Sequence, residues 1–322
     1  MSRHLPSSWR IERTRQVDRG EWQALAAADV AASGFHDPRF VALFAAWRPR
    51  SEAAYLELRD DAGNLRGGLP FLVQHRGRFQ AFSSGPAGSY GGPIAAAAAE
   101  RWALVDAFLS MGRLETLRRE MLCRAELAAP SPSLEPRTAG YLSLEGGFET
   151  FLRERFPRNR RNECNRSERR GLVFEMARDA ASVERFHAIL AENFVLWKTR
   201  PLELPFLVAL LEEMDAFTLF VVRYEGEVVG GHLCCEHGDE LFPWVGATAR
   251  RDGIFPAPYL IREEARYAAG RGLRVLNLGA SDGLAGVADF KRLLGASERT
   301  QWHLFREAGP LGVWRRLRGG RG

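Results

Sequence analysis

The sequence predicts an α+β protein built from two lobes, each with a mixed, largely antiparallel sheet flanked by helices. The chain has 322 residues, 46% of them hydrophobic, and is longer than the roughly 250–300 residues at which a single core usually stops growing. Its strand-like runs follow one another through short turns, which is typical of antiparallel meanders. The order helix, meander, glycine-bearing turn, helix and strand occurs twice, although the two halves share no residue-level identity.

The first lobe is predicted over residues 1–137. Asp60 to Asn64 (DDAGN) suits a hairpin turn between two alternating runs. We expect a helix at 35–47, then three strands at 55–59, 65–74 and 79–82. A glycine-rich turn at 83–93, a helix at 95–111 and a strand at 120–127 follow.

Prolines 130, 132 and 136 place the lobe boundary near residues 128–139, and a basic tail follows at 309–322. The second lobe, 138–308, is predicted to contain a helical stretch, a short strand, two helices, a three-stranded meander, and then helix, strand, helix and strand. Their ranges are 148–170, 173–176, 183–197, 204–214, 217–223, 227–236, 240–249, 258–269, 275–278, 287–294 and 301–306.

Composition excludes several classes of protein. A mean hydropathy of −0.25, no long apolar run and a polar start argue against a membrane span or a signal peptide, so a cytoplasmic location is expected. Four cysteines are too few for a disulfide scaffold. In the strand-like run HLCCEH, His232 and Cys234 would face one side and Cys235 and His237 the other, so no metal site is predicted.

Lys291 is a candidate catalytic residue because only it and Lys198 are lysines among 45 basic residues. An ammonium can lose its proton on burial, whereas a guanidinium cannot. The alternative is a helical lysine whose stem lies on the core and whose head lies in water.

A basic segment runs from Arg153 to Arg170 and holds eight arginines against three glutamates. Arg158, Arg161, Asn165 and Arg169 recur at helical spacing, so one helix face could bind phosphate oxygens. Arg160 and Arg161 are therefore candidate donor-binding residues. A solvated helix is the alternative.

Two turns could bind a ligand through bare backbone. Arg250, Arg251 and Gly253 follow the third meander strand, where the N–H groups of a following helix could bind pyrophosphate; a surface turn before a helix at Pro256 or Pro258 is equally consistent. In the first lobe, the glycines of SYGGP would let a ligand approach Tyr90, Gly91 and Gly92. Trp244 is a further substrate-binding candidate, although an aromatic residue in a strand is usually part of the core.

No G-x-S-x-G, P-loop or G-x-G-x-x-G motif is present, so nothing indicates a covalent route. Three stretches, RNRRN at 158–162, ARRDGIFPAPYLIREEARYAAGRGL at 249–273 and LNLGASDGLAGVADFKRLLGA at 276–296, carry a resemblance. The second lobe resembles the acyltransferase domain of FemAB-like and BioF/CelD-type proteins of the GNAT superfamily. The first lobe looks like the degenerate N-terminal GNAT repeat of the same proteins.

The resemblance implies tandem GNAT domains that move an acyl or aminoacyl group onto an amine, from coenzyme A or from aminoacyl-tRNA. Arg250 to Gly253 resembles the superfamily's pyrophosphate loop, but Phe255 stands where its last small residue belongs. Lys291 matches the F-K position of Fem-like transferases, where the lysine is implicated in handling the donor. Tyr90 to Gly92 matches the turn that lines their acceptor site.

Three hypotheses follow. In the first, the protein transfers an acyl group from acyl-CoA to a small-molecule or peptide amine by direct attack, without a metal, and Lys291 and Asp282 lie near the reacting carbonyl; Lys291→Arg would then abolish transfer and leave folding intact. In the second, the donor is an aminoacyl-tRNA held by the arginine helix and by Arg315, Arg316, Arg318 and Arg321. In the third, the chain is a non-catalytic module that binds RNA or a protein.

Overall fold

The computed structural model describes residues 6, 8–112, 115–124, 134–196, 201–281 and 285–307. The chain divides into two compact units: Met1–Arg137 together with Thr300–Gly322, and Thr138–Arg299. Asp282, Lys198 and the predicted tail at 309–322 lie outside the described residues.

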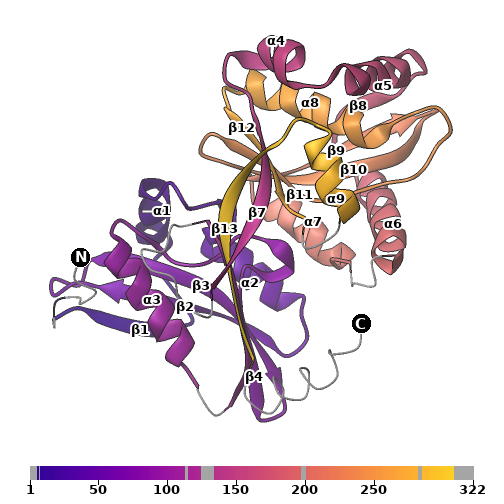
Figure 1. Cartoon of the computed structure of the whole chain (residues 1–322). Helices are drawn as coiled ribbons and strands as arrows, with labels where there is room; N and C mark the ends of the chain where they lie inside the picture. Colours follow the sequence, from indigo (N-terminus) through magenta and orange to yellow (C-terminus); the bar gives the residue numbers. More distant parts are fainter. Residues whose placement is uncertain are drawn as a thin grey trace, which may run out of the picture. The chain divides into compact units, whose positions relative to one another are not determined.

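The sheet of the first unit has the strand order β1, β2, β3, β4, β6, β13, and β5 also pairs with β3. Figure 1 labels β1 to β4 and β13 of this sheet. Neighbouring strands are antiparallel except for β4 and β6, which are parallel. The strands are β1 (Arg10–Thr14), β2 (Ser51–Arg59), β3 (Leu65–Arg76), β4 (Phe79–Ser84), β5 (Ile94–Ala95), β6 (Thr116–Cys123) and β13 (Ser297–Glu307).

Helices cover both faces of this sheet. Side chains alternate along β3, so neighbouring residues of this strand face helices on opposite sides. A Cβ atom added at Gly67 would lie 2.9 Å from Leu104 of α3 (Ala98–Ser110), and one at Gly68 would lie 2.6 Å from Trp22 of α1 (Arg19–Ala28). The short helix η1 (Gly34–His36) leads into α2 (Pro38–Ala46), which packs on β2 and β3, and η2 (Pro86–Gly88) follows β4. The core under α3 includes the rings of Phe71 and Phe108, 5.5 Å apart.

The sheet of the second unit has the order β7, β12, β11, β10, β9, β8. All described pairs are antiparallel except β11 and β12, which run parallel and pair only at Glu240–Val275 and Leu241–Leu276 within the described residues. The strands are β7 (Leu134–Ser143), β8 (Val173–Ala177), β9 (Phe217–Tyr224), β10 (Glu227–His237), β11 (Glu240–Thr248) and β12 (Val275–Ala280).

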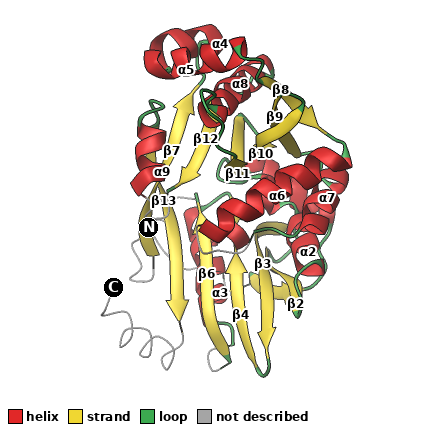
Figure 2. Cartoon of the chain, turned by 90° about the vertical axis from the view of Figure 1, so that its right-hand side faces the viewer, coloured by secondary structure: helices red, strands yellow, loops and turns green. Residues whose placement is uncertain are grey.

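Two layers of helices flank this second sheet (Figure 2). α6 (Ala180–Leu196) and α7 (Leu204–Glu213) pack on one face, and α8 (Pro256–Gly270) packs on the other. Outside α8 lie α4 (Gly147–Thr150) and α5 (Arg158–Arg169), joined by the short π-helix η3 (Phe151–Arg155). α9 (Ala285–Arg292) follows β12. The core between α8 and the sheet includes Phe220, Leu260 and Leu276.

The predicted α+β class and the largely antiparallel sheets are confirmed. The strand β7 was not predicted, because Pro136 falls inside it and prolines usually interrupt strands. Pro136, which has no N–H to donate, lies outside the segment 139–143 that pairs with β12. β1 and α1 were also missed. Residues 302–307 pair with β6, so residues 300–308 of the predicted second lobe cluster with the first unit.

Candidate functional site

The loop before α8 offers few backbone donors to an anion. Pro256 and Pro258 occupy the first turn of α8 and have no N–H group. The N–H of Phe255 donates to Ser167 Oγ of α5 at 2.9 Å, and the N–H of Ile254 donates to the Arg251 carbonyl at 3.4 Å. The helix N-terminus predicted to bind pyrophosphate therefore lacks the row of free N–H groups on which such binding depends.

Arg170, just after α5, covers the glycine of this loop. Its Nη1 donates to the Asp252 carbonyl at 3.1 Å, and its guanidinium occupies the space that a Cβ atom at Gly253 would need. Gly253 has φ +74°, which favours glycine. Arg250 and Arg251 are exposed beside it. The loop residues predicted from sequence thus lie together at the C-terminal end of α5.

Lys291 is buried, with only 9% of its surface exposed. Its Nζ donates to the carbonyls of Gly279 at 2.8 Å and Ala280 at 2.7 Å, at the end of β12. Its stem passes the backbone of β7, where a Cβ atom at Gly140 would lie 3.3 Å from Lys291 Cδ. The alternative of a lysine with its head in water is therefore wrong, because the ammonium is held by two carbonyl dipoles inside the fold.

The end of β12 is further ordered by Asn277, which is fully buried. Its Nδ2 donates to Glu240 Oε1 of β11 at 3.0 Å, and its Oδ1 accepts the N–H of Gly279 at 2.8 Å. β11 and β12 stop pairing just beyond Leu241 and Leu276. Lys291 thus contacts the part of β12 that no longer pairs with β11 but is still paired with β7.

Trp244 is the additional residue of a β-bulge in β11, since Leu233 pairs with Val245 whereas Cys234 pairs with Pro243. Its side chain is 9% exposed, and its ring meets that of Phe217 edge-on at 6.2 Å. This residue therefore packs in the sheet core on the α6 and α7 side, the default interpretation for an aromatic residue in a strand.

Sequence reasoning missed a buried carboxylate next to the histidine it had considered as a metal ligand. Glu264 of α8 is fully buried, and its Oε1 lies 2.7 Å from His232 Nδ1 and 3.7 Å from Cys234 Sγ. His232 and Cys234 do share one face of β10, as predicted. The partner could not be foreseen because Glu264 comes from an element 30 residues away, and no helical pattern marks a glutamate as buried.

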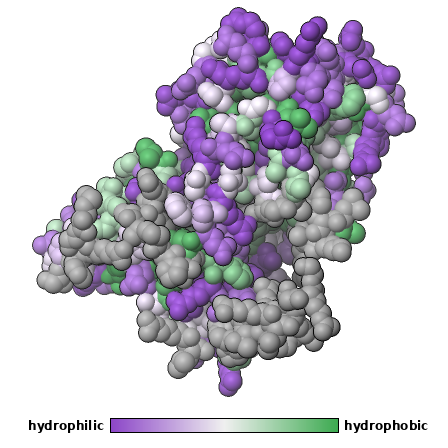
Figure 3. All heavy atoms as spheres, viewed as in Figure 1, coloured by the Kyte–Doolittle hydropathy of each residue, from purple (hydrophilic) through white to green (hydrophobic). Residues whose placement is uncertain are grey.

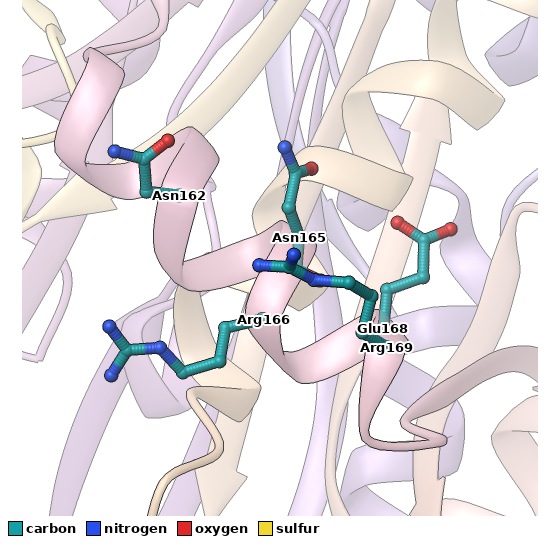
Figure 4. Close-up of a pocket in the computed structure, with 5 residues that line it drawn as sticks. All are labelled: Asn162, Asn165, Arg166, Glu168 and Arg169. Carbon is teal, nitrogen blue, oxygen red and sulfur yellow. The ribbon is translucent and has the colours of Figure 1, made fainter.

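The exposed face of α5 is rich in arginine, and hydrophilic side chains gather over this end of the second unit (Figure 3). A surface depression of about 630 Å³ is lined by residues that all project from α5, namely Asn162, Asn165, Arg166, Glu168 and Arg169 (Figure 4). We define the α5 arginine surface as Arg158, Arg161, Arg166, Arg169, Arg250 and Arg251.

Contacts with α8 fix the orientation of α5. Asn165 Oδ1 and Glu168 Oε2 both accept from the nearly buried guanidinium of Arg262, at 3.1 and 3.0 Å. Arg160 pairs with Glu163 at 2.7 Å. The Nε atoms of Arg160 and Arg161 are both buried with no hydrogen-bond partner among the described residues. The contact with α8 uses the Oδ1 acceptor of Asn165, so whether the predicted stripe binds phosphate stays a prediction.

The turn with Tyr90, Gly91 and Gly92 lies in the first unit and is buried. The N–H of Gly91 donates to the Leu122 carbonyl at 2.7 Å, and that of Gly92 donates to Ser84 Oγ at 2.9 Å. A Cβ atom at Gly91 would lie 2.5 Å from the backbone nitrogen of Gly85. Close backbone approach at Gly91, and a φ of +90° with the Cys123 side chain nearby at Gly92, account for these glycines without a ligand. The acceptor-binding role remains a prediction.

All four cysteines are free and buried. Burial raises the pKa of Cys123 to about 12 and that of Cys164 to about 12, and it raises the pKa of Cys234 well above its ordinary value, with the Glu264 carboxylate adding to the shift. We expect iodoacetamide at pH 8 to leave these thiols unlabelled in the native protein and to label all four after unfolding, as measured by mass spectrometry. Rapid labelling of the native chain would show an accessible thiolate.

Among the described residues, no cluster of histidine, cysteine and carboxylate side chains is arranged to hold a metal ion. No helix in the described part of the chain is long and apolar enough to cross a bilayer.

Comparisons with known proteins agree with this architecture. Residues 154–292 match the family model described as "Acetyltransferase (GNAT) domain". No curated protein matches the sequence significantly.

Similar solved structures cover nearly the whole chain at low sequence identity. FemX is 12% identical with a TM-score of 0.68, and the alignment covers 91% of this chain and 96% of FemX. The C-terminal domain of a putative lysylphosphatidylglycerol synthetase from Agrobacterium fabrum is 12% identical with a TM-score of 0.58, covering 92% and 94%. A tandem GNAT protein from the clavulanic acid biosynthesis pathway is 12% identical with a TM-score of 0.52, covering 94% and 99%.

The family match falls on the unit that holds Lys291, the loop before α8 and the arginines of α5, and the shared fold extends over both units. Residues 154–292 therefore belong to the GNAT acetyltransferase family, which makes the second unit a domain of the acyltransferase class, and the chain as a whole has the fold of FemX.

Proposed function

We propose that this protein transfers an aminoacyl group from aminoacyl-tRNA to an amine. The choice of donor rests on the small number of backbone N–H groups available at the N-terminus of α8. Pro256 and Pro258 remove two N–H groups, Ser167 accepts a third, and Arg170 covers Gly253. A coenzyme A pyrophosphate would depend on such N–H groups, whereas the phosphates of an RNA strand can be bound by arginine side chains spread over a surface.

The α5 arginine surface supports this donor. Arg158, Arg166, Arg169, Arg250 and Arg251 are exposed, and Arg170 and Ser167 hold the loop against α5, so both sets of guanidinium groups belong to one surface. Of the acidic residues nearby, Glu168 is paired with Arg262. The name of one structural neighbour, a lysylphosphatidylglycerol synthetase, describes a product that carries an aminoacyl group, which is consistent with aminoacyl transfer.

The proposed reaction is direct attack. The acceptor nitrogen attacks the ester carbonyl of the aminoacyl group, a C–N bond forms, the C–O bond to the tRNA ribose breaks, and the amine proton passes to the departing oxygen. No enzyme nucleophile is needed, which agrees with four buried thiols. Lys291 stabilises negative charge on the reacting carbonyl from the end of β12, and Asp282 orients the amine.

Acyl-CoA is the second candidate donor. The family model that matches the second unit is named for acetyl transfer, and this observation favours a coenzyme A thioester. The two donors make different demands on the protein: a thioester needs a site for one pyrophosphate, whereas a tRNA engages many exposed arginines.

A thermal-shift experiment distinguishes these donors, because a ligand that binds only the native state raises the melting temperature. We expect aminoacyl-tRNA at a hundred times its Kd to stabilise the protein by about 2.7 kcal/mol, and acetyl-CoA to leave the melting temperature unchanged. Tryptophan fluorescence reports the melting of the protein in the presence of RNA. Stabilisation by acetyl-CoA with none by tRNA would reverse the assignment, and stabilisation by tRNA without aminoacyl transfer would indicate a binding module.

Salt dependence of binding tests the surface itself. Arg166→Ala with Arg169→Ala is expected to weaken tRNA binding and to reduce the slope of log K against log salt by about 0.7–0.9 for each phosphate that the protein no longer neutralises. Arg10→Ala with Arg76→Ala, two exposed arginines of the first unit, is the matched control. An unchanged slope in the α5 variant would remove this surface from donor binding.

A further inference from the structure

The first unit contains a small cavity that belongs to none of the features described above. Its volume is about 90 Å³. Its lining includes Phe44, Arg48, Leu72, Gln74, Ser83 and Glu120. All of them lie within residues 44–120, so the cavity is formed entirely within one unit.

The strand register shows how the sequence builds the cavity floor. Leu72 of β3 pairs with Ser83 of β4, which pairs in turn with Glu120 of β6. The adjacent row on the same face consists of Gln74, Ala81 and Arg118. Cross-strand partners point to the same side of a sheet, so these six side chains form two parallel rows across three strands. Phe44 and Arg48, one helical turn apart, close the cavity from α2 and the residues after it.

Arg48 brings an uncompensated positive charge to this cavity. Its guanidinium lies over the ring of Phe44, 5.4 Å from the centroid, and its side chain has no ion pair or hydrogen bond to any described residue. The Ser83 hydroxyl also lacks a described partner. A half-buried guanidinium beside a hydroxyl and an apolar wall is suited to bind a carboxylate.

Glu120 brings a negative charge to the same cavity. Its Oε1 lies 3.5 Å from His303 Nε2, and its Oε2 lies 3.4 Å from Arg118 Nη2. The hydrogen bond from His303 holds the pKa of Glu120 below its ordinary value, and the charge of Arg118 lowers it further. The carboxylate is therefore ionised at neutral pH, and its remaining lone pairs can accept from an ammonium group.

Size limits the ligand further. Since one water-sized atom needs about 15 Å³ of such volume, the cavity admits about six non-hydrogen atoms. That is the size of glycine or alanine, and far below the several hundred Å³ typical of sites for drug-sized ligands.

We propose that this cavity binds a small α-amino acid as a zwitterion, with its carboxylate on Arg48 and Ser83 and its ammonium on Glu120. Gln74 lines the cavity beside these groups, and Phe44 and Leu72 supply the apolar wall against its short side chain. The proposal goes beyond aminoacyl transfer and holds whichever donor the second unit uses.

Isothermal titration calorimetry on the full chain, without any donor, tests this site. We expect glycine and L-alanine to bind, and acetate and methylamine, which each lack one of the two charges, to bind at least tenfold more weakly. L-leucine is expected not to bind because of its size. Arg48→Leu and Glu120→Gln should each weaken L-alanine binding by about 10- to 100-fold, since each removes a charged hydrogen-bond partner. Arg10→Leu, the same substitution at an exposed site of this unit, should leave binding unchanged.

The proposal is overturned if L-alanine does not bind at millimolar concentration, if acetate binds equally well, or if Arg48→Leu binds as the native chain does. Circular dichroism confirms that each variant is folded, and Arg48→Lys, which keeps the charge, should retain part of the affinity. Because no donor is present, a negative result leaves the aminoacyl-transfer proposal untouched, and failure of tRNA binding leaves this one untouched.

Discussion

Replacing Lys291 with methionine is expected to lower the rate of transfer by about 10²- to 10³-fold, the loss seen when one charge-stabilising donor is removed from an active site. Methionine matches the length and apolar stem of lysine, so it fills the slot beside Gly140 without the ammonium. The carbonyls of Gly279 and Ala280 lose their donor, which costs about 1–3 kcal/mol of stability for each buried group left unpaired. Initial rates and denaturant unfolding measure the two effects.

Arg292→Met is the matched control for this substitution. Arg292 is adjacent to Lys291 but its side chain is 71% exposed, paired with Asp289 on the surface, so neither rate nor stability should change appreciably. If Lys291→Met is destabilised yet retains full turnover below its melting temperature, the ammonium only supports the end of β12. Lys291→Arg is a poorer test than the sequence suggested. The guanidinium of arginine is larger than the buried space that the lysine side chain fills, so this substitution is expected to disturb folding as well.

Gly91→Ala is expected to destabilise the first unit by several kcal/mol, enough to prevent folding in a marginally stable domain. The added Cβ atom would lie 2.5 Å from the backbone nitrogen of Gly85 and 2.5 Å from the carbonyl carbon of Ser84. Backbone atoms cannot rotate away as the tip of a side chain can, so the strand end of β4 would have to move. Thermal unfolding followed by circular dichroism measures the loss.

Gly77→Ala separates this steric effect from the general effect of replacing a glycine. Gly77 lies in a turn with φ +62°, and a Cβ atom there meets nothing within 4 Å, so only a conformational cost of about 1 kcal/mol is expected. Equal stability of the two variants would show that the backbone around Gly91 can move enough to accommodate a Cβ atom. In that case a ligand-binding role for Tyr90, Gly91 and Gly92 would become the better explanation of the two glycines.

Hydrophobic periodicity and turn chemistry were sufficient to predict most elements of the second unit, from β8 to β12, because each is marked by local patterns. They failed at β7, where prolines dominate the local signal and pairing with β12 decides the outcome. They also could not reveal that Ser167, Arg170 and Phe255 meet, since residues of α5 and of the loop before α8 are separated by more than 80 positions. Because α5 contacts this loop, the N–H of Phe255 and the space beside Gly253 are already occupied by side chains of α5 and Arg170.

The sequence by itself determined the class of protein and its chemistry in outline: two α+β lobes, a GNAT-like second lobe, an arginine-rich helix and a rare lysine near the end of the chain. Only the tertiary structure decided that Lys291 is buried on the carbonyls of β12, that Phe255 at the start of α8 donates its N–H to Ser167, and that Arg48 and Glu120 share a cavity. The physical reason is that periodicity and motif spacing report interactions between near neighbours in the chain. Burial, hydrogen-bond partners and charge compensation are set by residues that meet only when the sheets assemble.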